Sequence, residues 1–249
     1  MDAFYNLMRE IITPGLRNSQ FAYKEKLQSY LKSGNRWLEV GCGHQLLPAW
    51  MPHAATIERQ IISSCRHIVG VDPDFNSLSQ HAGIRDKVCA FVNQLPFSND
   101  CFDLVTANMV LEHIADPEST VREIARVCKP GGIFIFHTPN AHGYSTLVTS
   151  LIPDPLIPRL SHFLLGRQPA DVYPTHYRLN TRAAIAGAAA RQGLEIVEYI
   201  SCESSAQARM LGPIVILELL LIRLLRWPRL VNFRTNIIVV LQKPLDRIP

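Results

Sequence analysis

Short runs of apolar and β-branched residues recur along the chain and are separated by stretches of helical length. Seven runs predict strands, at residues 37–40, 68–71, 88–92, 104–107, 133–136, 194–200 and 237–241. The first five are continuous rather than alternating, which is typical of parallel strands covered by helices on both faces. The pattern therefore predicts an α/β fold with a doubly wound sheet.

Two of the intervening helices have clear end signals. One begins at Asp116, which can cap free amides, and at Pro117, which fits a first turn, and it stops at the Lys-Pro-Gly-Gly sequence of residues 129–132. The other runs from Asn180 or Thr181 through an alanine-rich stretch to Gly193, which suits a C-terminal cap.

The length of 249 residues suits one domain with embellishments. We predict a single domain over residues 1–249, in which residues 1–35 form N-terminal helices and residues 36–140 form a cofactor-binding core. Residues 141–180, with five prolines, and residues 201–235 are expected as inserts around the substrate.

Composition narrows the class of protein. An apolar fraction of 47% with 18% charged residues is ordinary for a globular enzyme. The net charge of +4 is spread along the chain without Lys/Arg blocks, which argues against a nucleic-acid partner. The six cysteines form no CxxC pair, so neither a disulfide framework nor a metal site is indicated. The first residues do not resemble a secretory signal, which predicts a cytoplasmic protein.

The most apolar stretch, residues 210–225, is interrupted by Glu218 and is too short and too charged to span a membrane. Helical spacing places four apolar side chains on one face with two arginines beside them: Ile214, Leu217, Leu221 and Leu224, with Arg223 and Arg226. The first insert carries similar apolar residues: Leu147, Leu151, Ile152, Leu156, Ile157 and Phe163. Such segments could form a lid over an apolar substrate or lie on a membrane surface. They could equally pack on the sheet or in a dimer, so a monomer and a homodimer both remain open.

The end of the first strand carries the first signal for a cofactor. Gly41 and Gly43 flank Cys42 there, and glycine lets the backbone approach a ligand at the carboxyl end of a central strand. A dinucleotide site needs a small residue where Leu46 stands, which argues against NAD or FAD. Asp72 ends the second strand, where a carboxylate can accept hydrogen bonds from ribose hydroxyls.

Three further segments follow in order: LPFSNDCFDLV at residues 95–105, VLEHIADP at residues 110–117, and KPGG at residues 129–132. Together with the EVGCG sequence before them, they resemble class I S-adenosylmethionine (SAM)-dependent methyltransferases of the ubiquinone/menaquinone-biosynthesis type. The resemblance covers residues 36–138, with a weaker echo at residues 175–200. It implies a Rossmann-like, mostly parallel seven-stranded sheet whose last strand is antiparallel, with SAM as cofactor.

The resemblance also assigns roles to residues. Glu39, Gly41, Cys42 and Gly43 would line the methionine end of SAM, Asp72 would hold the ribose, Asn93 would border the adenine, and Asn108 would contact the methionine portion. Two residues depart from the family pattern: Gln45 stands in place of a third glycine, and Phe91 in place of an acidic residue. These departures leave open a non-catalytic interaction protein with a degenerate SAM site.

Methyl transfer from a sulfonium is an in-line displacement, so positioning can supply much of the catalysis. An oxygen acceptor would benefit from a general base, for which histidine is suited. The candidates are His176, which the resemblance places near the substrate mouth, His137 at the end of the fifth strand, and His142. A packing or capping role is the alternative for each. Glu112 and His113 are open to a functional or a structural interpretation in the same way.

The sequence thus predicts an enzyme that methylates a small molecule. The apolar inserts favour a bulky, hydrophobic acceptor such as a quinone, polyketide, lipid or glycolipid precursor. A nucleotide-dependent oxidoreductase is disfavoured by Leu46 and by the run from residue 95 to residue 132. A nucleic-acid methyltransferase is disfavoured because the chain lacks a basic stripe and an Asn/Asp-Pro-Pro-aromatic signature.

Overall fold

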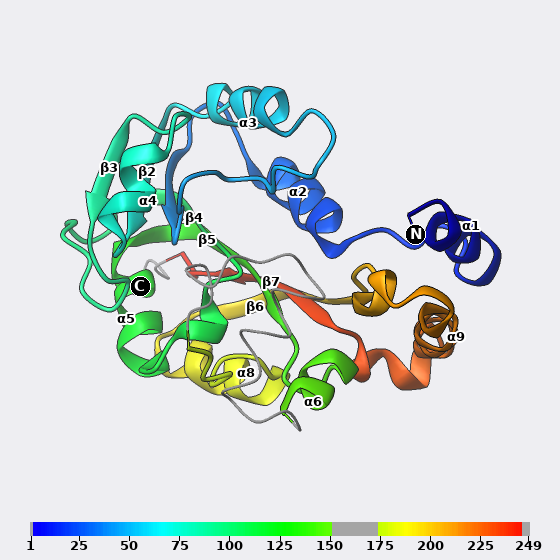
Figure 1. Cartoon of the computed structure of the whole chain (residues 1–249). Helices are drawn as coiled ribbons and strands as arrows, with labels where there is room; N and C mark the ends of the chain where they lie inside the picture. The colour runs from blue at the N-terminus through cyan, green and yellow to red at the C-terminus, as the bar shows by residue number, and fades with distance from the viewer. Residues whose placement is uncertain (1, 151–173, 246–249) are drawn as a thin grey trace. The chain divides into compact units, whose positions relative to one another are not determined.

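The computed structural model describes residues 2–150 and 174–245 of the chain (Figure 1). The strands are β1 (Arg36–Val40), β2 (His67–Asp72), β3 (Asp86–Cys89), β4 (Phe102–Asn108), β5 (Cys128–Pro139), β6 (Glu195–Cys202) and β7 (Asn236–Gln242). The α-helices are α1 (Asp2–Ile12), α2 (Ser19–Tyr30), α3 (Ala54–Ser63), α4 (Phe75–Gln80), α5 (Pro117–Val127), α6 (Tyr144–Ser150), α8 (Arg182–Arg191) and α9 (Val215–Leu225). The short 3-10 helices are η1 (Leu111–His113), η4 (Gln207–Met210), η5 (Gly212–Ile214) and η6 (Pro228–Phe233).

The strands form one seven-stranded sheet in the order β3-β2-β1-β4-β5-β7-β6. The pairs β1–β2, β1–β4, β2–β3 and β4–β5 are parallel. Strand β7 runs antiparallel to β5, because the amide of Gly131 donates to the carbonyl of Lys243 whereas that of Asn140 donates to the carbonyl of Thr235. The predicted doubly wound sheet with an antiparallel last strand is confirmed. Its winding direction reverses between β1 and β4, so the carboxyl ends of these two strands flank a switch point.

All seven predicted strands are present, and their bounds differ most at β3 and β5. Strand β3 ends at Cys89 rather than at residue 92, because its partner β2 ends at Asp72, which pairs with Cys89. Strand β5 begins at Cys128 and includes the Lys-Pro-Gly-Gly residues that were predicted to end the helix. These residues become part of the strand because the chain at the end of β7 offers partners: the amide of Lys243 donates to the carbonyl of Gly132 at 3.0 Å.

The predicted helix ends are present at α5 and α8. The Asp116 side chain accepts a hydrogen bond from the amide of Ser119, with Pro117 following it in the first turn. The Thr181 hydroxyl accepts from the amide of Ala184 at 3.2 Å, and Gly193 after the helix has a φ of 69°. Each cap satisfies amides or allows a left-handed turn that an ordinary residue would resist.

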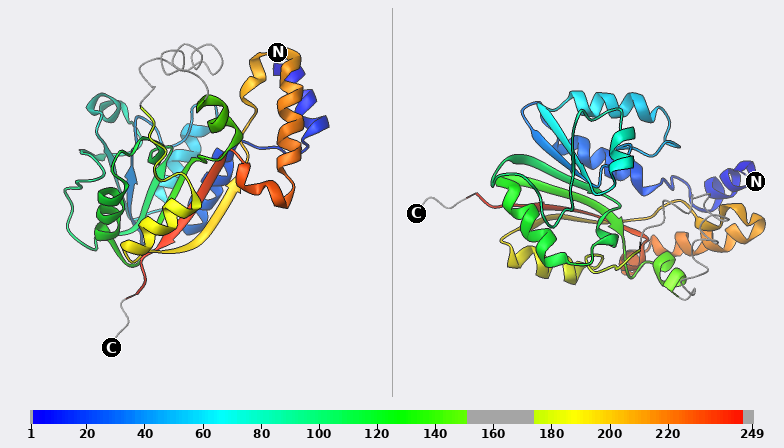
Figure 2. Two further views of the ribbon diagram at one scale, coloured as in Figure 1. Left: turned by 90° about the horizontal axis from the view of Figure 1, so that it is seen from below. Right: turned by 60° about the vertical axis from the view of Figure 1, so that its left-hand side comes forward.

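The chain divides into two compact units. One comprises Tyr23–Thr138, His176–Tyr199 and Ile238–Pro249, and it holds nearly all of the sheet. Within it, α2 and α3 lie over one face of the sheet and α5 and α8 over the other (Figures 1 and 2). Its core is filled by large side chains with almost no exposed surface, among them Trp37, Phe102, Phe134 and Phe136. We call this part the sheet unit.

The other unit comprises Met1–Ala22, Pro139–Thr175 and Ile200–Ile237, and we call it the helical unit. Helices α1 and α9 pack together around a core formed by Tyr5, Leu16, Ala206, Val215, Leu219 and Ile222. Within the apolar helix α9, Glu218 accepts hydrogen bonds from the Tyr144 hydroxyl and from the amides of Gln207 and Ala208 at 2.7–2.8 Å. This polar pocket explains how a carboxylate is tolerated in an otherwise apolar helix.

Among the described helices, none is long and apolar enough to cross a membrane. In the first predicted insert, Leu147 is exposed, whereas Leu151, Ile152, Leu156, Ile157 and Phe163 lie outside the described residues. The assignment of residues 1–249 to a single domain with two inserts stays a prediction.

Candidate functional site

The glycine loop after β1 joins the carboxyl ends of two neighbouring strands. The amides of Gly41 and Cys42 both donate to the carbonyl of Val71, at 2.7 and 3.1 Å. Gly41 and Gly43 have φ values of +66° and +52°, in the left-handed region that favours glycine. A Cβ on Gly41 would lie 2.3 Å from a methyl carbon of Val110, so this backbone passes too close to its neighbour for any side chain.

Asp72, at the end of β2, is oriented by the backbone on both sides. One carboxylate oxygen accepts from the amide of Gly43 and the other from the amide of Asp74, each at 2.9 Å. A carboxylate oxygen can accept more than one hydrogen bond, so both oxygens keep capacity for a pair of hydroxyls. The geometry suits the predicted ribose contact.

Glu39 is buried within the sheet, with 3% of its surface exposed. It faces Thr106 across the β1–β4 pair, and the Thr106 hydroxyl donates to its carboxylate while the Trp37 indole donates to that hydroxyl. Burial, with a smaller contribution from the nearby Glu58 carboxylate, raises the pKa of Glu39 to about 8 despite these hydrogen bonds. A cation placed beside this carboxyl would favour its charged form.

The turn that follows the glycine loop is held by a second buried carboxylate. Glu58, on α3, accepts hydrogen bonds from the amides of Leu46 and Leu47 at 3.1 and 3.4 Å. Leu46 and Leu47 are themselves buried in the core. The bulky residue that argues against a dinucleotide site therefore has a packing role. Gln45, in the position of the missing third glycine, is partly buried.

Asn108 and His137 are direct partners at the carboxyl ends of β4 and β5. The imidazole Nδ1 lies 2.9 Å from the amide oxygen of Asn108, and the ring stacks on Tyr23 with centroids 5.6 Å apart. With that amide oxygen as acceptor, Nδ1 carries the ring proton. The His137 side chain is buried, and burial lowers its pKa to about 3. His137 is therefore a neutral, enclosed imidazole that holds Asn108.

His176 lies on the surface of the sheet unit, in the segment before α8. Its amide and that of Tyr177 both donate to the carbonyl of Glu112, at 2.7 and 3.2 Å. The Glu112 side chain is buried and accepts from the hydroxyl of Thr138 at 2.9 Å. Glu112 thus ties the segment of His176 to the end of β5, which is a clear structural role. His142, the third histidine candidate, is exposed and belongs to the helical unit.

The loop after β3 carries the predicted adenine residue. Asn93 is exposed there, and Phe91, in place of the expected acidic residue, has 69% of its surface exposed. An exposed aromatic ring offers a flat apolar face on which a nucleobase can stack. The loop therefore lacks the carboxylate of the family pattern, but its exposed Asn93 and Phe91 could still contact a nucleobase.

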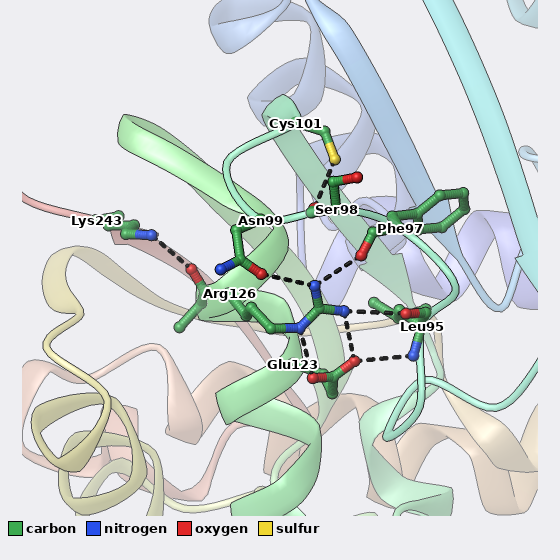
Figure 3. Close-up of polar contacts among 9 residues, drawn as sticks. Leu95, Phe97, Ser98, Asn99, Cys101, Glu123, Arg126 and Lys243 are labelled. Atoms are coloured by element: carbon green, nitrogen blue, oxygen red, sulfur yellow. Dashed lines mark hydrogen bonds and ion pairs between the residues drawn. The ribbon is translucent and has the colours of Figure 1, made fainter.

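A salt bridge on α5 fastens the continuation of this loop, residues 95–101 (Figure 3). The Arg126 guanidinium donates to the carbonyls of Leu95 and Phe97 at 2.9 and 2.7 Å and to the side chain of Asn99 at 3.0 Å. It also pairs with Glu123 at 2.7 Å, and Glu123 accepts from the amide of Leu95. We call Arg126 and Glu123 the α5 latch.

The sheet unit thus brings together Glu39, Gly41, Cys42, Gly43, Asp72, Asn108 and His137 at the carboxyl ends of β1, β2, β4 and β5. The sequence interpretation did not include Thr106, Glu58 or the α5 latch. A polar threonine within the apolar run of β4 was a signal for the first. The i,i+3 spacing of Glu123 and Arg126 was a signal for an ion pair, though not for its partners in the loop. No cluster of metal-ligating side chains occurs in the described residues.

Comparison of the sequence with known proteins identifies a family and several relatives. A family model described as a methyltransferase domain matches residues 16–199. The chain is 33% identical over 109 residues to a demethylmenaquinone methyltransferase of Mycobacterium marinum, covering 41% of this chain and 47% of the relative. It is 27% identical over 145 residues to a malonyl-[acyl-carrier protein] O-methyltransferase of Erwinia billingiae, covering 56% and 54%. The chain thus spans about half the length of these curated relatives.

Among solved structures, one that resembles the chain is a complex between the Haloferax volcanii Trm112 methyltransferase activator and a methyltransferase. The TM-score is 0.58 at 18% identity, and the match covers 98% of this chain and 95% of the other. At this level of identity the likeness concerns the fold, and it agrees with the Rossmann-like sheet described above.

Proposed function

Because this chain belongs to the methyltransferase domain family, as its sequence resemblance predicted, we propose that it transfers a methyl group from SAM to a small-molecule acceptor. The observation that carries the proposal is the arrangement of Asp72 beside the glycine loop. Its two oxygens are each fixed by one backbone amide and retain acceptor capacity, at the switch point where ligands bind in sheets of this topology.

The residues at the switch point fit SAM. Its ribose has two adjacent hydroxyls, which match the two oriented oxygens of Asp72. Its methionine end is cationic, and the buried carboxyl of Glu39 is the group that a cation would stabilise in charged form. The side-chain-free backbone at Gly41 and Gly43 permits close approach. Asn108 would hold the methionine portion, and Asn93 with Phe91 would border the adenine.

Bound SAM supplies an electrophilic methyl group on a sulfonium. The chain then has to hold the acceptor atom in line with that methyl group and exclude water, and these positional effects can supply much of the rate enhancement. The hydrogen bonds of Glu39 to Thr106 and of Asn108 to His137 hold two of the proposed cofactor contacts in place before any ligand arrives.

We assign the two predicted catalytic histidines different roles. His176 is exposed, so its imidazole is accessible to a hydroxyl acceptor and can take its proton. His137 is buried to 1% exposure, so we assign it the positioning of Asn108 rather than contact with an acceptor. His176→Ala should lower kcat with little effect on SAM affinity, whereas His137→Ala should weaken SAM binding.

The acceptor we propose is bulky and apolar, such as a quinone, polyketide or lipid precursor. One fact supports this choice: one relative is a demethylmenaquinone methyltransferase. A radiolabelled methyl donor offered with a panel of apolar and hydrophilic acceptors tests it. Methylation of the hydrophilic acceptors alone would refute an apolar substrate.

Calorimetric titration with SAM and with S-adenosylhomocysteine tests the cofactor site itself. We expect micromolar binding, and a loss of about tenfold or more in Asp72→Asn, which keeps an oxygen for one amide but removes the charge. Asp86→Asn, an exposed aspartate on β3, is the matched control and should bind like the wild type. Absence of binding by the wild type would favour a non-catalytic interaction protein with a degenerate site.

A further inference from the structure

Helix α9 is apolar on both sides, although only one side is needed for packing. Val215, Leu219, Ile222 and Leu225 are buried, the first three in the core of the helical unit. The opposite side is exposed, and Leu217 leaves 71% of its surface in solvent. We call this exposed side the apolar face of α9; it comprises Ile214, Leu217, Leu220, Leu221 and Leu224. Ile214 lies directly before the helix, and its spacing from the leucines places all five on one side. Exposed apolar groups of this kind are typical of an interaction surface.

Neighbouring elements of the same unit also expose apolar side chains. Trp227 and Phe233, which follow α9, are 65% and 45% exposed. Helix α1 packs beside α9 (Figures 1 and 2) and exposes Phe4, Leu7 and Ile11 at i, i+3 and i+7 spacing. Leucine and aromatic side chains are the apolar residues typical of segments that lie in a lipid interface.

The charges of the segment that carries α9 are mostly positive, whereas α1 carries both signs, with Arg9, Asp2 and Glu10. Residues 207–235 contain five arginines and one acidic residue, an excess of +4 that equals the net charge of the whole chain. The acidic residue is Glu218, which is already bound to Tyr144 and two backbone amides. Arg209, Arg223 and Arg229 are exposed. The segment therefore presents a cationic, apolar surface whose complement is anionic and apolar.

We propose that the apolar face of α9 docks on a lipid surface rich in anionic headgroups, with the helix lying in the plane of the interface. At 11 residues α9 is too short to span a bilayer, which leaves the in-plane orientation. A second copy of the chain fits less well: because residues 207–235 carry an excess charge of +4, a symmetric dimer would bring like charges together. This docking is independent of the proposed methyl transfer.

Vesicle flotation tests the proposal on the full chain without any substrate. We expect binding to vesicles of phosphatidylcholine with phosphatidylserine, weaker binding to phosphatidylcholine alone, and release by salt. Leu217→Ser should weaken binding about tenfold or more, and Arg209→Gln and Arg229→Gln about fivefold each at low ionic strength. Two substitutions in the sheet unit are matched controls and should bind like wild type: Phe75→Ser, at a side chain 69% exposed, and Arg85→Gln.

Three results would overturn the proposal. One is equal binding to neutral and anionic vesicles, and another is binding that none of the variants weakens. The third is a dimer in sedimentation equilibrium that Leu217→Ser converts to monomer, which would assign the face to a second copy. The arginine variants alter only exposed side chains, so they remain informative if Leu217→Ser fails to fold. If the wild type did not bind SAM, the proposed function would be refuted, but vesicle binding would still be expected.

Discussion

Replacing Arg126 with methionine removes the guanidinium of the α5 latch and keeps most of its aliphatic volume. Four partners lose their charged donor: the carbonyls of Leu95 and Phe97, the Asn99 amide oxygen and the carboxylate of Glu123. The pairing with Arg126, with smaller help from the amide of Leu95, holds the pKa of Glu123 below its usual range. The substitution therefore removes the contacts that hold residues 95–101 and leaves the partly buried Glu123 carboxylate without its cationic partner.

The size of the expected loss of stability follows from how deeply the α5 latch is buried. The two side chains of the latch are 28% and 17% exposed, so the pair lies between a surface ion pair, which contributes about 0–1 kcal/mol, and a buried one, whose disruption costs about 3–5 kcal/mol. Hydrogen bonds to charged groups make a net contribution of about 1.5–3 kcal/mol each, and less where the groups are partly exposed. We expect Arg126→Met to lower the free energy of unfolding by about 3 kcal/mol, equivalent to a fall in Tm of roughly 6–12 °C for a chain of this size.

Urea unfolding at constant pH measures this loss, and the chain offers a matched control. Arg191 pairs with Glu118 on the surface, with side chains 59% and 42% exposed, so Arg191→Met should cost much less stability than Arg126→Met. Equal losses in the two variants would refute the argument from burial. A second readout is SAM affinity: because the latch holds the loop that follows Asn93, Arg126→Met should weaken SAM binding and Arg191→Met should not.

Three further outcomes follow from the site. Gly41→Ala should lose SAM binding and stability, because the new Cβ would lie 2.3 Å from a methyl carbon of Val110. Gly34→Ala is the control: it has open space around it and should leave SAM binding unchanged. Calorimetric titration and thermal unfolding measure both effects. SAM binding at pH 7 should release roughly one proton, because the cationic methionine end lowers the raised pKa of Glu39. Calorimetric titrations in buffers of different ionisation enthalpy measure the number of protons released. If Glu39→Gln released the proton as the wild type does, Glu39 would not be its source. His137 is buried neutral with its pKa lowered to about 3, so its contribution to stability is full above the unfolded pKa of about 6.5 and is lost at about 1.4 kcal/mol per pH unit below it. His137→Gln should therefore flatten the fall in urea midpoint between pH 6.5 and 5, and an unchanged slope would show that the ring is not buried neutral.

Structural features that depend on residues close together in the sequence could be predicted from the sequence. The continuous apolar runs predicted the strands, and the caps at Asp116, Thr181 and Gly193 predicted helix ends, because each signal arises within a few residues. The glycines after β1 and the aspartate after β2 marked one edge of the sheet, because the carboxyl ends of adjacent parallel strands meet there.

Features that depend on partners far away in the chain required the tertiary structure. Glu39 was a strand-end acid by sequence, but its burial against Thr106, 67 residues later, follows from the β1–β4 register. His137 was a plausible base until its packing under Tyr23 showed an enclosed ring.

Periodicity alone left helix α9 ambiguous, because apolar residues surround nearly its whole circumference. Packing against α1 selected one side for the core and left Leu217 and its neighbours in solvent. The sequence by itself thus determined the sheet, the edge at which the proposed cofactor contacts lie, and the family. Only the tertiary structure decided which polar groups are buried together and which apolar groups stay outside, because burial depends on contacts between segments that sequence order does not specify.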